Sequence, residues 1–345
     1  MATLTEISIQ TRKGIRYFIF GIIALVIAKV ALDTTIGIYR FFFPAPPPPP
    51  TVSFGKLPSL PFPQITRPEL TFTLETPDGE LPQLPTQSRV YFMPKPAATL
   101  LSLDNAIQRA TRLGFRADAE EVSQTLYRFP HRGSPSTLEY NIALNTFSIS
   151  YDLAQDASPL ERIPPPAETA TNSVHSFLSG ANLLPEDLTG ITTHSFLKIQ
   201  EGLLVASLGQ SDADLIKVNL FRRDYDSLPS VTPRVNEANV WFMISGAPER
   251  DKQIIAAEYH YFAVDEEQSS TYPIKTAQAA WEELQDGGGF IANLSENTNI
   301  VVRRVYLANF DAGSPVDFFQ PVVVFEGDNE FVAYVPAVTD EYYGE

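Results

Sequence analysis

The pattern of hydrophobic and polar positions changes once, sharply, along the chain. Residues 15–43 are apolar almost throughout, with an unbroken apolar run over 17–28 and only Lys29, Asp33 and Arg40 as charges beyond that run. At about 1.5 Å per residue, a helix of this length spans about 43 Å, more than the roughly 30 Å hydrocarbon core of a bilayer. Because a segment in lipid must satisfy its own backbone hydrogen bonds, we predict a transmembrane signal-anchor helix over 15–43.

The charges before this apolar segment predict its orientation. Three basic residues precede or begin it, against the single acid Glu6. By the positive-inside rule, residues 1–14 form a cytoplasmic tail and the chain beyond the helix lies outside the membrane. A cleaved signal peptide is the alternative, because a basic start, an apolar stretch and a small residue at Ala28 also fit that pattern.

Two sets of residues in the apolar segment are candidates for contact with a partner subunit. Small residues at heptad-like spacing would let another helix pack closely, and polar groups on roughly the opposite side would meet polar groups of a partner. Lys29 and Asp33 are four residues apart and can also neutralise each other within the helix. Snorkelling of the basic side chains to the outer interface, with no specific neighbour, is an equal alternative. The candidate partner-binding residues are Gly21, Ala24, Ala28, Lys29, Asp33 and Arg40.

A proline-rich stretch follows the apolar segment. Ten prolines occur among the 25 residues of 44–68, with a continuous run at 46–50. Such a run favours a stiff polyproline II rod, so we predict a linker that holds the folded part away from the membrane. A ligand for a proline-recognition domain is the alternative function of the same residues.

From residue 69 to residue 338 the hydrophobic pattern alternates between helical and strand periods. Apolar residues recur at helical spacing in three segments, 103–113, 167–182 and 276–286, and stretches with strand alternation follow each of them. We therefore predict an α+β fold of three units, each with one helix packed on an antiparallel sheet. The predicted units are 69–151, 164–264 and 265–338, followed by an acidic tail over 339–345.

The last of these units carries a distinctive run of residues. A Tyr-Pro pair precedes a helix containing Ala-Trp-Glu-Glu-Leu, a glycine run follows, and Gln-Pro-Val-x-Val-Phe-Glu-Gly comes later. These features resemble the C-terminal half of YycI/YycH-type regulators, membrane-anchored extracytoplasmic proteins that act on a sensor histidine kinase, and the helix-plus-strand plan is similar to PepSY-like domains. The resemblance implies a non-catalytic regulatory role and a sensor kinase as a candidate partner. The signature residues, whose expected purpose is to specify the fold, are Tyr272, Pro273, Trp281, Gly287, Gln320, Pro321, Phe325, Glu326 and Gly327.

The composition excludes some partners and some kinds of site. The chain has a formal net charge of −16, and the part after residue 43, with 20 basic and 39 acidic residues, carries about −19. Such a charge repels nucleic acid, so we expect no nucleic-acid binding. Without any cysteine, the chain has neither disulfides nor thiolate metal ligands.

Few titratable residues suggest catalysis or a metal site. The four histidines lack metal-ligand spacing, and the sequence contains no phosphate loop, serine elbow or dinucleotide fingerprint. Glu258 and His260 share one face of a predicted strand, where we expect them to be surface residues of the sheet. The acidic clusters at 212–214 and 265–267 lack the ligand spacing of a calcium-binding loop, so we interpret them as solvated surface. We therefore expect no cofactor and no enzyme activity.

The predicted function is that of a regulatory or binding protein. It would be anchored in the membrane by one helix, with the bulk of the chain outside, and would interact with a membrane or cell-envelope protein. A structural or assembly component of the envelope, with the proline-rich segment as spacer, is the alternative. An envelope hydrolase is a third and weaker one, and self-association stays open.

Overall fold

The computed structural model describes residues 4–42, 48–64, 68–295 and 297–344, with side chains from Tyr17 onward except those of residues 19, 24 and 40–42. The chain divides into two compact units, Met1–Pro49 and Pro50–Glu345. The described residues of the first unit form one long helix, α1 (Leu4–Phe42), of 39 residues.

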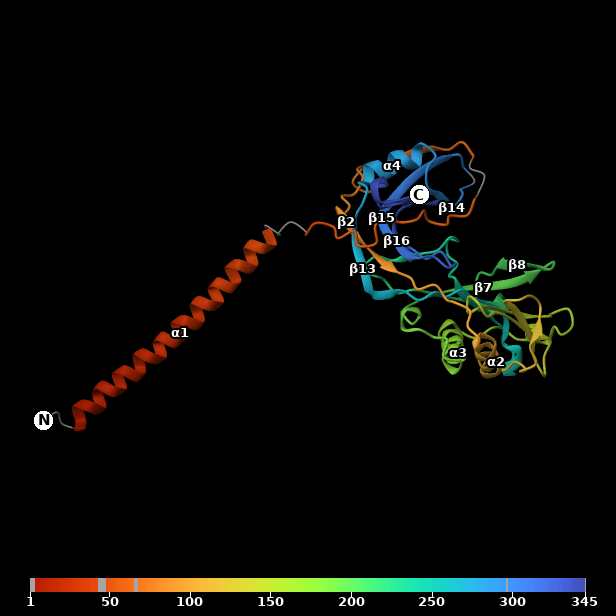
Figure 1. Ribbon diagram of the computed structural model, residues 1–345, viewed down its shortest axis with the longest axis horizontal. Helices are drawn as coiled ribbons and strands as arrows, with labels where there is room; N and C mark the ends of the chain where they lie inside the picture. Colours follow the sequence, from red (N-terminus) through yellow and green to blue (C-terminus); the bar gives the residue numbers. More distant parts are fainter. Residues whose placement is uncertain (1–3, 43–47, 65–67, 296, 345) are drawn as a thin grey trace. The chain divides into compact units, whose positions relative to one another are not determined.

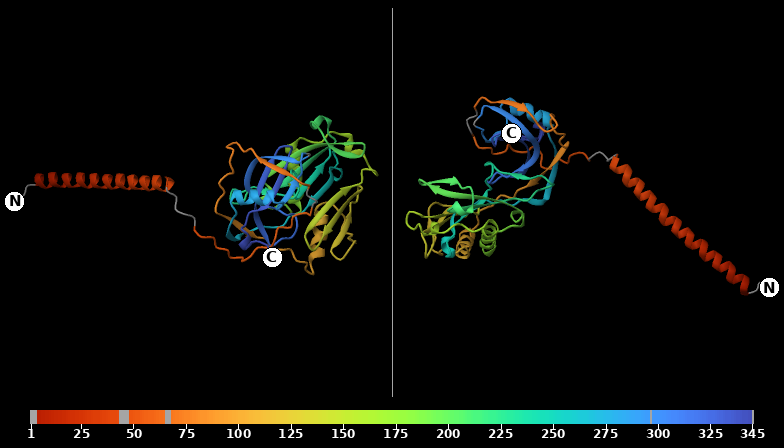
Figure 2. Two further views of the ribbon diagram at one scale, coloured as in Figure 1. Left: turned by 90° about the horizontal axis from the view of Figure 1, so that it is seen from above. Right: turned by 180° about the vertical axis from the view of Figure 1, so that it is seen from behind.

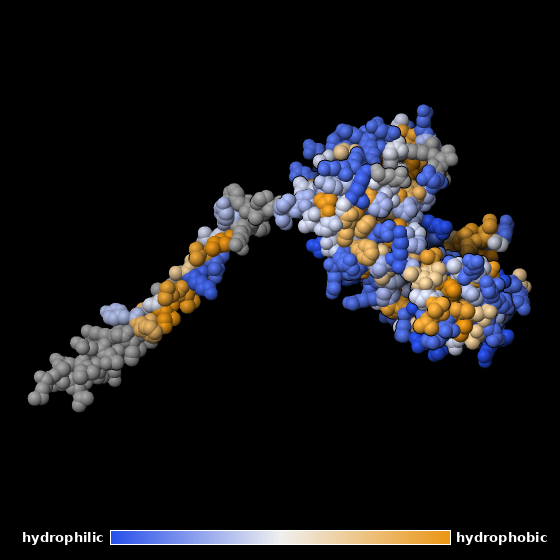
Figure 3. All heavy atoms as spheres, in the orientation of Figure 1, coloured by the Kyte–Doolittle hydropathy of each residue, from blue (hydrophilic) through white to orange (hydrophobic). Residues whose placement is uncertain are grey.

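Helix α1 is long and apolar enough to cross a membrane. The relevant part is Phe20–Tyr39, with a mean hydropathy of 1.9 and no residue buried against the rest of the chain. Figure 3 shows hydrophobic atoms along the described part of this helix, interrupted by a hydrophilic patch. Length and composition of this kind are shared by membrane anchors and by signal sequences near an N-terminus.

In the part of the chain that the structure describes, the second unit contains two sheets, one of nine strands and one of eight. All neighbouring strands of the nine-stranded sheet are antiparallel. Tight turns such as that at Asn145, whose φ is +57°, allow the chain to reverse between strands. From one edge to the other the strands are β3 (Glu120–Glu121), β4 (Leu126–Pro130), β5 (Ser136–Asn141), β6 (Thr146–Tyr151), β12 (Ile254–Tyr259), β11 (Val240–Ile244), β9 (Leu215–Phe221), β7 (Ile191–Gln200) and β8 (Leu203–Ala206).

Two helices cover one face of the nine-stranded sheet. They are α2 (Ser102–Arg112) and α3 (Ala167–Gly180), which lie side by side in the views of Figures 1 and 2. Small and branched residues at helical spacing on both helices pack on every second residue of the strands and form one core on this face of the sheet. The buried residues of this core include Ala106, Ala110, Val174, Leu178, Leu138, Phe147, Val218 and Phe242.

The eight-stranded sheet is built around its longest strands. Helix α4 (Ala277–Gln285) packs against it (Figure 1). At the start of this helix the Thr276 side chain accepts a hydrogen bond from the Ala279 amide at 3.1 Å. The helix ends before Gly287, whose φ is +96°. Two short strands run parallel to the strand that they pair with, and the other pairs are antiparallel. The main path is β1 (Thr71–Leu74), β15 (Asn299–Phe310), β16 (Phe318–Gly327), β17 (Val332–Pro336) and β14 (Phe290–Asn293); β10 (Ser230–Val231) also pairs with β15, and β2 (Gln87–Phe92) pairs with β16 and β13 (Asp265–Pro273).

Strand pairing crosses the boundaries of the three predicted units. Strand β6, from the predicted unit 69–151, pairs with β12 from the predicted unit 164–264, so the two merge into one sheet. Strands β1 and β2 of the first predicted unit join the sheet of the third. The physical reason is that an edge strand leaves backbone N–H and C=O groups unpaired, and these groups bond to whichever strand the fold brings beside them.

The predicted linker 44–68 also differs from the structure. From Pro50 onward it belongs to the compact unit, and Leu57 is fully buried. The Leu57 amide donates to the carbonyl of Tyr342 at 2.8 Å, and the Gly344 amide donates to the carbonyl of Leu57 at 3.0 Å. Residues 342–344 of the predicted acidic tail therefore pair with Leu57. We call residues 50–64 the strap; it has no regular secondary structure, so its burial leaves no period in the sequence.

A buried arginine joins the two sheets. Arg222, immediately after β9, is bonded through Nη1 to Asp187 at 2.7 Å and through Nε to Asp311, immediately after β15, at 2.6 Å. Its Nη2 donates to the carbonyl of Phe262 at 2.5 Å, and its guanidinium lies 4.5 Å from the ring centre of Tyr261. Burial alone would lower the pKa of Arg222, but Asp311 and Asp187 outweigh it and raise the pKa, so the group stays charged.

The strap gives a stability prediction. Replacing Leu57 with alanine should lower the free energy of unfolding of the full chain by about 2–5 kcal/mol, because a fully buried leucine leaves a cavity. Urea unfolding of the full chain in detergent measures this free energy of unfolding. The matched control is Leu100→Ala, since Leu100 is fully exposed and should change little. Equal stability of both variants would show that the strap does not pack on the folded unit.

Candidate binding groove between the two sheets

The face of the nine-stranded sheet opposite the helices carries a row of polar and aromatic residues. In the strand register Glu258 lies opposite Trp241, and Trp241 lies opposite Asn219. Their neighbours Val240 and Phe242 point the other way, into the core under the helices. Because successive side chains of a strand alternate between faces, the row belongs to the face without helices.

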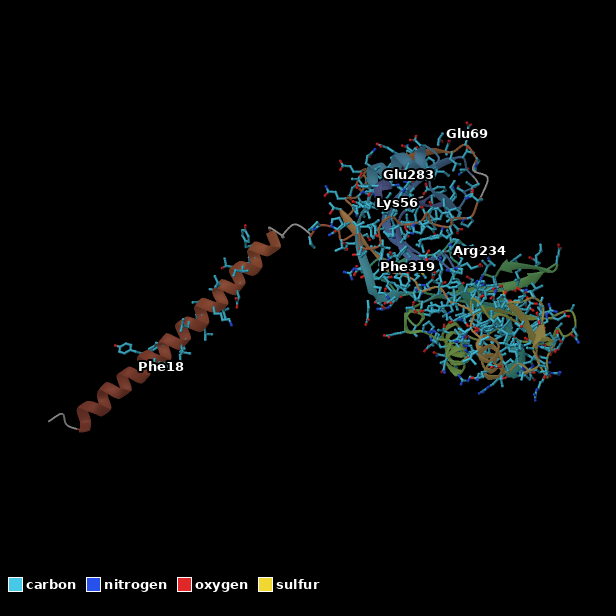
Figure 4. All side chains as sticks on the ribbon, in the orientation of Figure 1. Phe18, Lys56, Glu69, Arg234, Glu283 and Phe319 are labelled. Atoms are coloured by element: carbon cyan, nitrogen blue, oxygen red, sulfur yellow. The ribbon has the colours of Figure 1, made fainter. Side chains whose placement is uncertain are left out.

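A groove with a volume of about 610 Å³ opens beside this row. One wall comes from Trp241 and Glu258 of the nine-stranded sheet and from His260, immediately after β12. The other comes from residues 290–292 of β14 in the eight-stranded sheet. Figure 4 shows Arg234 in the region where the two sheets meet. The remaining lining residues are Pro63, Pro233, Arg234, Glu237, Ala238, Asn239, Ala312 and Gly313.

Charged residues around Trp241 form a connected set. Lys217 lies 4.3 Å from the centre of the Trp241 ring and is paired with Glu237, which is also paired with Arg234 at 2.6 Å. Burial raises the pKa of Glu237, but its hydrogen bonds with Lys217 and Arg234 outweigh this and hold the pKa below its usual range. The floor of the groove thus combines an aromatic surface with fixed charges of both signs.

Glu258 and His260 form a hydrogen-bonded pair in the groove. The Glu258 carboxylate lies 2.9 Å from His260 Nε2, and both side chains are partly exposed. Among the described residues, no group of three histidine or acidic side chains is placed to hold a metal ion. The pair therefore offers hydrogen bonds of both kinds to a ligand. Glu258 lies in β12 as expected, whereas His260 was expected in the same strand and follows its end.

Strand β14, whose residues 290–292 line the groove, is the last strand on the path of its sheet and pairs only with β17 among the described strands. A strand with one unpaired edge presents backbone N–H and C=O groups that an extended peptide can bond to. We therefore expect a ligand of the groove to make main-chain contacts in addition to side-chain ones.

The predicted partner-binding residues lie in α1, outside this folded unit. Gly21, Ala28, Lys29 and Asp33 are all exposed on the helix. No ion pair joins Lys29 to Asp33 within the described part of the chain, because a spacing of four residues brings two side chains within reach without forcing contact. The side chains of Ala24 and Arg40 lie outside the described residues.

Several signature residues form the core under α4. Trp281 is 8% exposed, and its ring centre lies 5.8 Å from that of Phe325, which is fully buried. Gly327 is required because a Cβ there would lie 2.6 Å from the carbonyl oxygen of Val301. Glu326 accepts a hydrogen bond from the Tyr306 hydroxyl at 2.6 Å.

Other signature residues hold the strap. The buried Tyr272 hydroxyl donates to the carbonyl of Gly55 at 2.9 Å, and Gln320 Nε2 donates to the carbonyl of Pro58 at 3.0 Å. Pro273 ends β13. Pro321 is the fourth residue of β16. Pairing with β17 begins one residue later, at Val322, which makes the proline tolerable.

Sequence reasoning missed most of the groove. It considered Glu258 and His260, but not Trp241, Arg234 or Glu237, and it assigned no strand to β14. No signal in the sequence marked Trp241, because its strand, VWFMI, is hydrophobic at every position. The acidic residues 265–267, expected on the solvated surface, begin β13.

The architecture defines an α+β protein with an N-terminal apolar helix and mainly antiparallel sheets. No family model matches the sequence, and no curated protein matches it at a significant level. Among solved structures, the chain is similar to an uncharacterized protein from Eubacterium rectale ATCC 33656, with 11% identity over 75% of this chain and 85% of that one and a TM-score of 0.41. It is also similar to the Bacillus megaterium YpeB C-terminal domain, with 11% identity over 71% and 95% of the two chains and a TM-score of 0.31. At these values neither similarity assigns a family, and the resemblance to YycI/YycH-type regulators stays a prediction.

The charge set in the groove predicts a pH-dependent stability. Because the pKa of Glu237 is lowered by folding, its charged form stabilises the folded state above the usual glutamate pKa, and this contribution is lost as the pH falls through the lowered value. Glu237→Gln should therefore lower the free energy of unfolding by about 1 kcal/mol at pH 7, and the difference should vanish in acid. Urea unfolding between pH 7 and pH 3 measures this, with the exposed Glu201→Gln as control. A difference that is the same at both ends of this range would contradict the assignment.

Proposed function

We propose that the protein is a membrane-tethered, non-catalytic binding protein that acts outside the cytoplasm. Its groove would hold an extended segment of a membrane or cell-envelope protein, and its apolar helix would keep the folded unit at the membrane surface. The observation that carries the proposal is the groove between the two sheets, with Trp241 on its floor and the edge of β14 in its wall.

The groove has the properties of a site for a peptide segment. Its volume of about 610 Å³ lies in the range of ligand sites, and an apolar wall at residues 290–292 faces Trp241. Edge strands recruit extended peptides through main-chain hydrogen bonds, while neighbouring side chains select the sequence. Charges of both signs at Arg234 and Glu237 would fix the register of such a segment.

The apolar helix supports the location. A helix of this length, preceded by basic residues, favours an uncleaved anchor with its N-terminus inside. The folded unit follows the apolar helix directly in the sequence, so an anchor in that helix would keep the unit at the membrane. A membrane protein beside the anchor is therefore the favoured partner, and the resemblance to YycI/YycH-type regulators makes a sensor kinase the first candidate.

The helix itself would add a second contact with that partner. Lys29 and Asp33 are polar groups within an otherwise apolar segment, and such groups in membranes commonly meet polar groups of a neighbouring helix. Small residues at Gly21 and Ala28 would permit close packing of that neighbour.

Photo-crosslinking in native membranes tests the proposal. A benzoylphenylalanine at position 234, in the groove, should give one adduct of defined mass, whereas the same residue at position 112, exposed on α2, should give none. Trp241→Ala should reduce the adduct several-fold, because it removes the aromatic floor. Lys29→Leu with Asp33→Leu should reduce it as well if the helix contributes.

Two results would count against this function. An adduct with twice the mass of the chain, unaffected by the changes in the helix, would favour self-assembly as an envelope component. Equal crosslinking from positions 234 and 112 would show that the groove is not the binding surface.

A further inference from the structure

A second cavity lies on the helix-covered side of the nine-stranded sheet, apart from the groove. It has a volume of about 330 Å³ and is formed where the last turn of α2 meets the β5–β6 turn and the residues after α3. The side chains of residues 258–261 alternate between the groove and this cavity: Glu258 and His260 line the groove, whereas Tyr259 and Tyr261 line the cavity. Most of its lining is apolar or aromatic, including Leu144, Leu183, Leu184, Tyr259, Tyr261 and Phe262.

Arg109 is the one charged residue among the described residues that line this cavity. Its Nη1 donates to the Tyr140 hydroxyl at 2.6 Å and to Asn145 Oδ1 at 3.0 Å. These neutral partners fix the position of the guanidinium and do not compensate its charge. Within the described part of the chain, no carboxylate lies within ion-pair distance of Arg109, and its Nε and Nη2 groups have no protein acceptor.

The tyrosines around Arg109 do not supply the missing negative charge. Burial raises the pKa of Tyr140, and the hydrogen bond from Arg109 only partly offsets this. Burial also raises the pKa of Tyr259, so both hydroxyls stay neutral at physiological pH.

The chain compensates the fully buried Arg222 differently from Arg109, which is half-buried. Arg222 is buried with two aspartates in direct contact. With 41 acidic residues against 25 basic ones, a carboxylate partner for Arg109 would be easy to supply from the chain, yet none is placed there. An arginine fork that is held in position, faces an apolar cavity and keeps free donors is suited to an anion from outside.

We propose that this cavity binds a carboxylate attached to an apolar body. The carboxylate would accept hydrogen bonds from the free donors of Arg109, and the apolar body would pack against Leu183, Leu184 and Tyr261. Two sources carry this chemistry: the C-terminus of a peptide that ends in an apolar residue, and a short fatty acid. The site is separate from the groove, and its occupancy does not depend on the function proposed above.

Calorimetry on the full chain in phosphatidylcholine nanodiscs tests the site with small probes. N-acetyl-leucine should bind saturably, and N-acetyl-leucine amide, which lacks the charge, should bind at least tenfold more weakly. Hexanoate distinguishes the two sources: tighter binding than N-acetyl-leucine identifies a fatty acid, and weaker binding identifies a peptide C-terminus.

Matched variants locate the binding. Arg109→Gln should weaken N-acetyl-leucine at least tenfold, whereas Arg112→Gln, exposed on the same helix and outside the lining, should leave it unchanged. Leu184→Trp fills the apolar part of the cavity while keeping Arg109, and it should also abolish binding. This variant tests the site even if Arg109→Gln fails to fold. Equal binding of acid and amide, no binding of either carboxylate, or binding that survives both Arg109→Gln and Leu184→Trp would overturn the proposal.

Discussion

The buried ion network of Arg222 is the interaction on which the arrangement of the two sheets depends. Its three contacts come from separate parts of the chain: Asp187 precedes β7, Phe262 follows β12, and Asp311 follows β15. Removing water from a guanidinium is expensive, and only close, hydrogen-bonded carboxylates offset that cost. The network therefore admits one relative position of the strand ends, since any displacement would leave buried charge uncompensated.

That constraint creates the groove. With the ends of β9 and β15 fixed to each other, β14 stands opposite the face that carries Trp241. The single strand β12 then separates two different environments, because its alternating side chains reach the groove on one side and the Arg109 cavity on the other. The groove is built on the cores of both sheets, whereas the Arg109 cavity is built on the core under α2 and α3.

The periodic elements of this fold could be predicted from the sequence. The helices near 103–113, 167–182 and 276–286 were expected from apolar spacing alone, because their burial repeats with a local period. The strap at Leu57 could not be predicted, since its burial depends on Tyr342 and Gly344 at the far end of the chain. Proline content pointed to an extended conformation there but says nothing about what an extended segment contacts.

Strand partners and the groove were beyond prediction for a related reason. A hydrophobic period of two identifies the buried face of a strand but not the strand that it pairs with. The sequence of β6 therefore does not show that it pairs with β12. Trp241 and residues 290–292 lie in different sheets and meet only through tertiary packing. Glu258 and His260 could be predicted as neighbours, because two residues that are two positions apart in an extended segment lie on the same side of it.

Single-cysteine labelling tests the central claim, a folded unit outside the cytoplasm whose groove is covered by a partner. The chain has no cysteine, so Leu208→Cys, at a fully exposed position, and Ala292→Cys, in the groove wall, each give one reactive site. With a membrane-impermeant maleimide on intact cells, we expect rapid labelling at 208 and strong protection at 292, and rapid labelling at both once the chain is purified. No labelling at 208 in intact cells, or equal labelling at 292 before and after purification, would contradict the account.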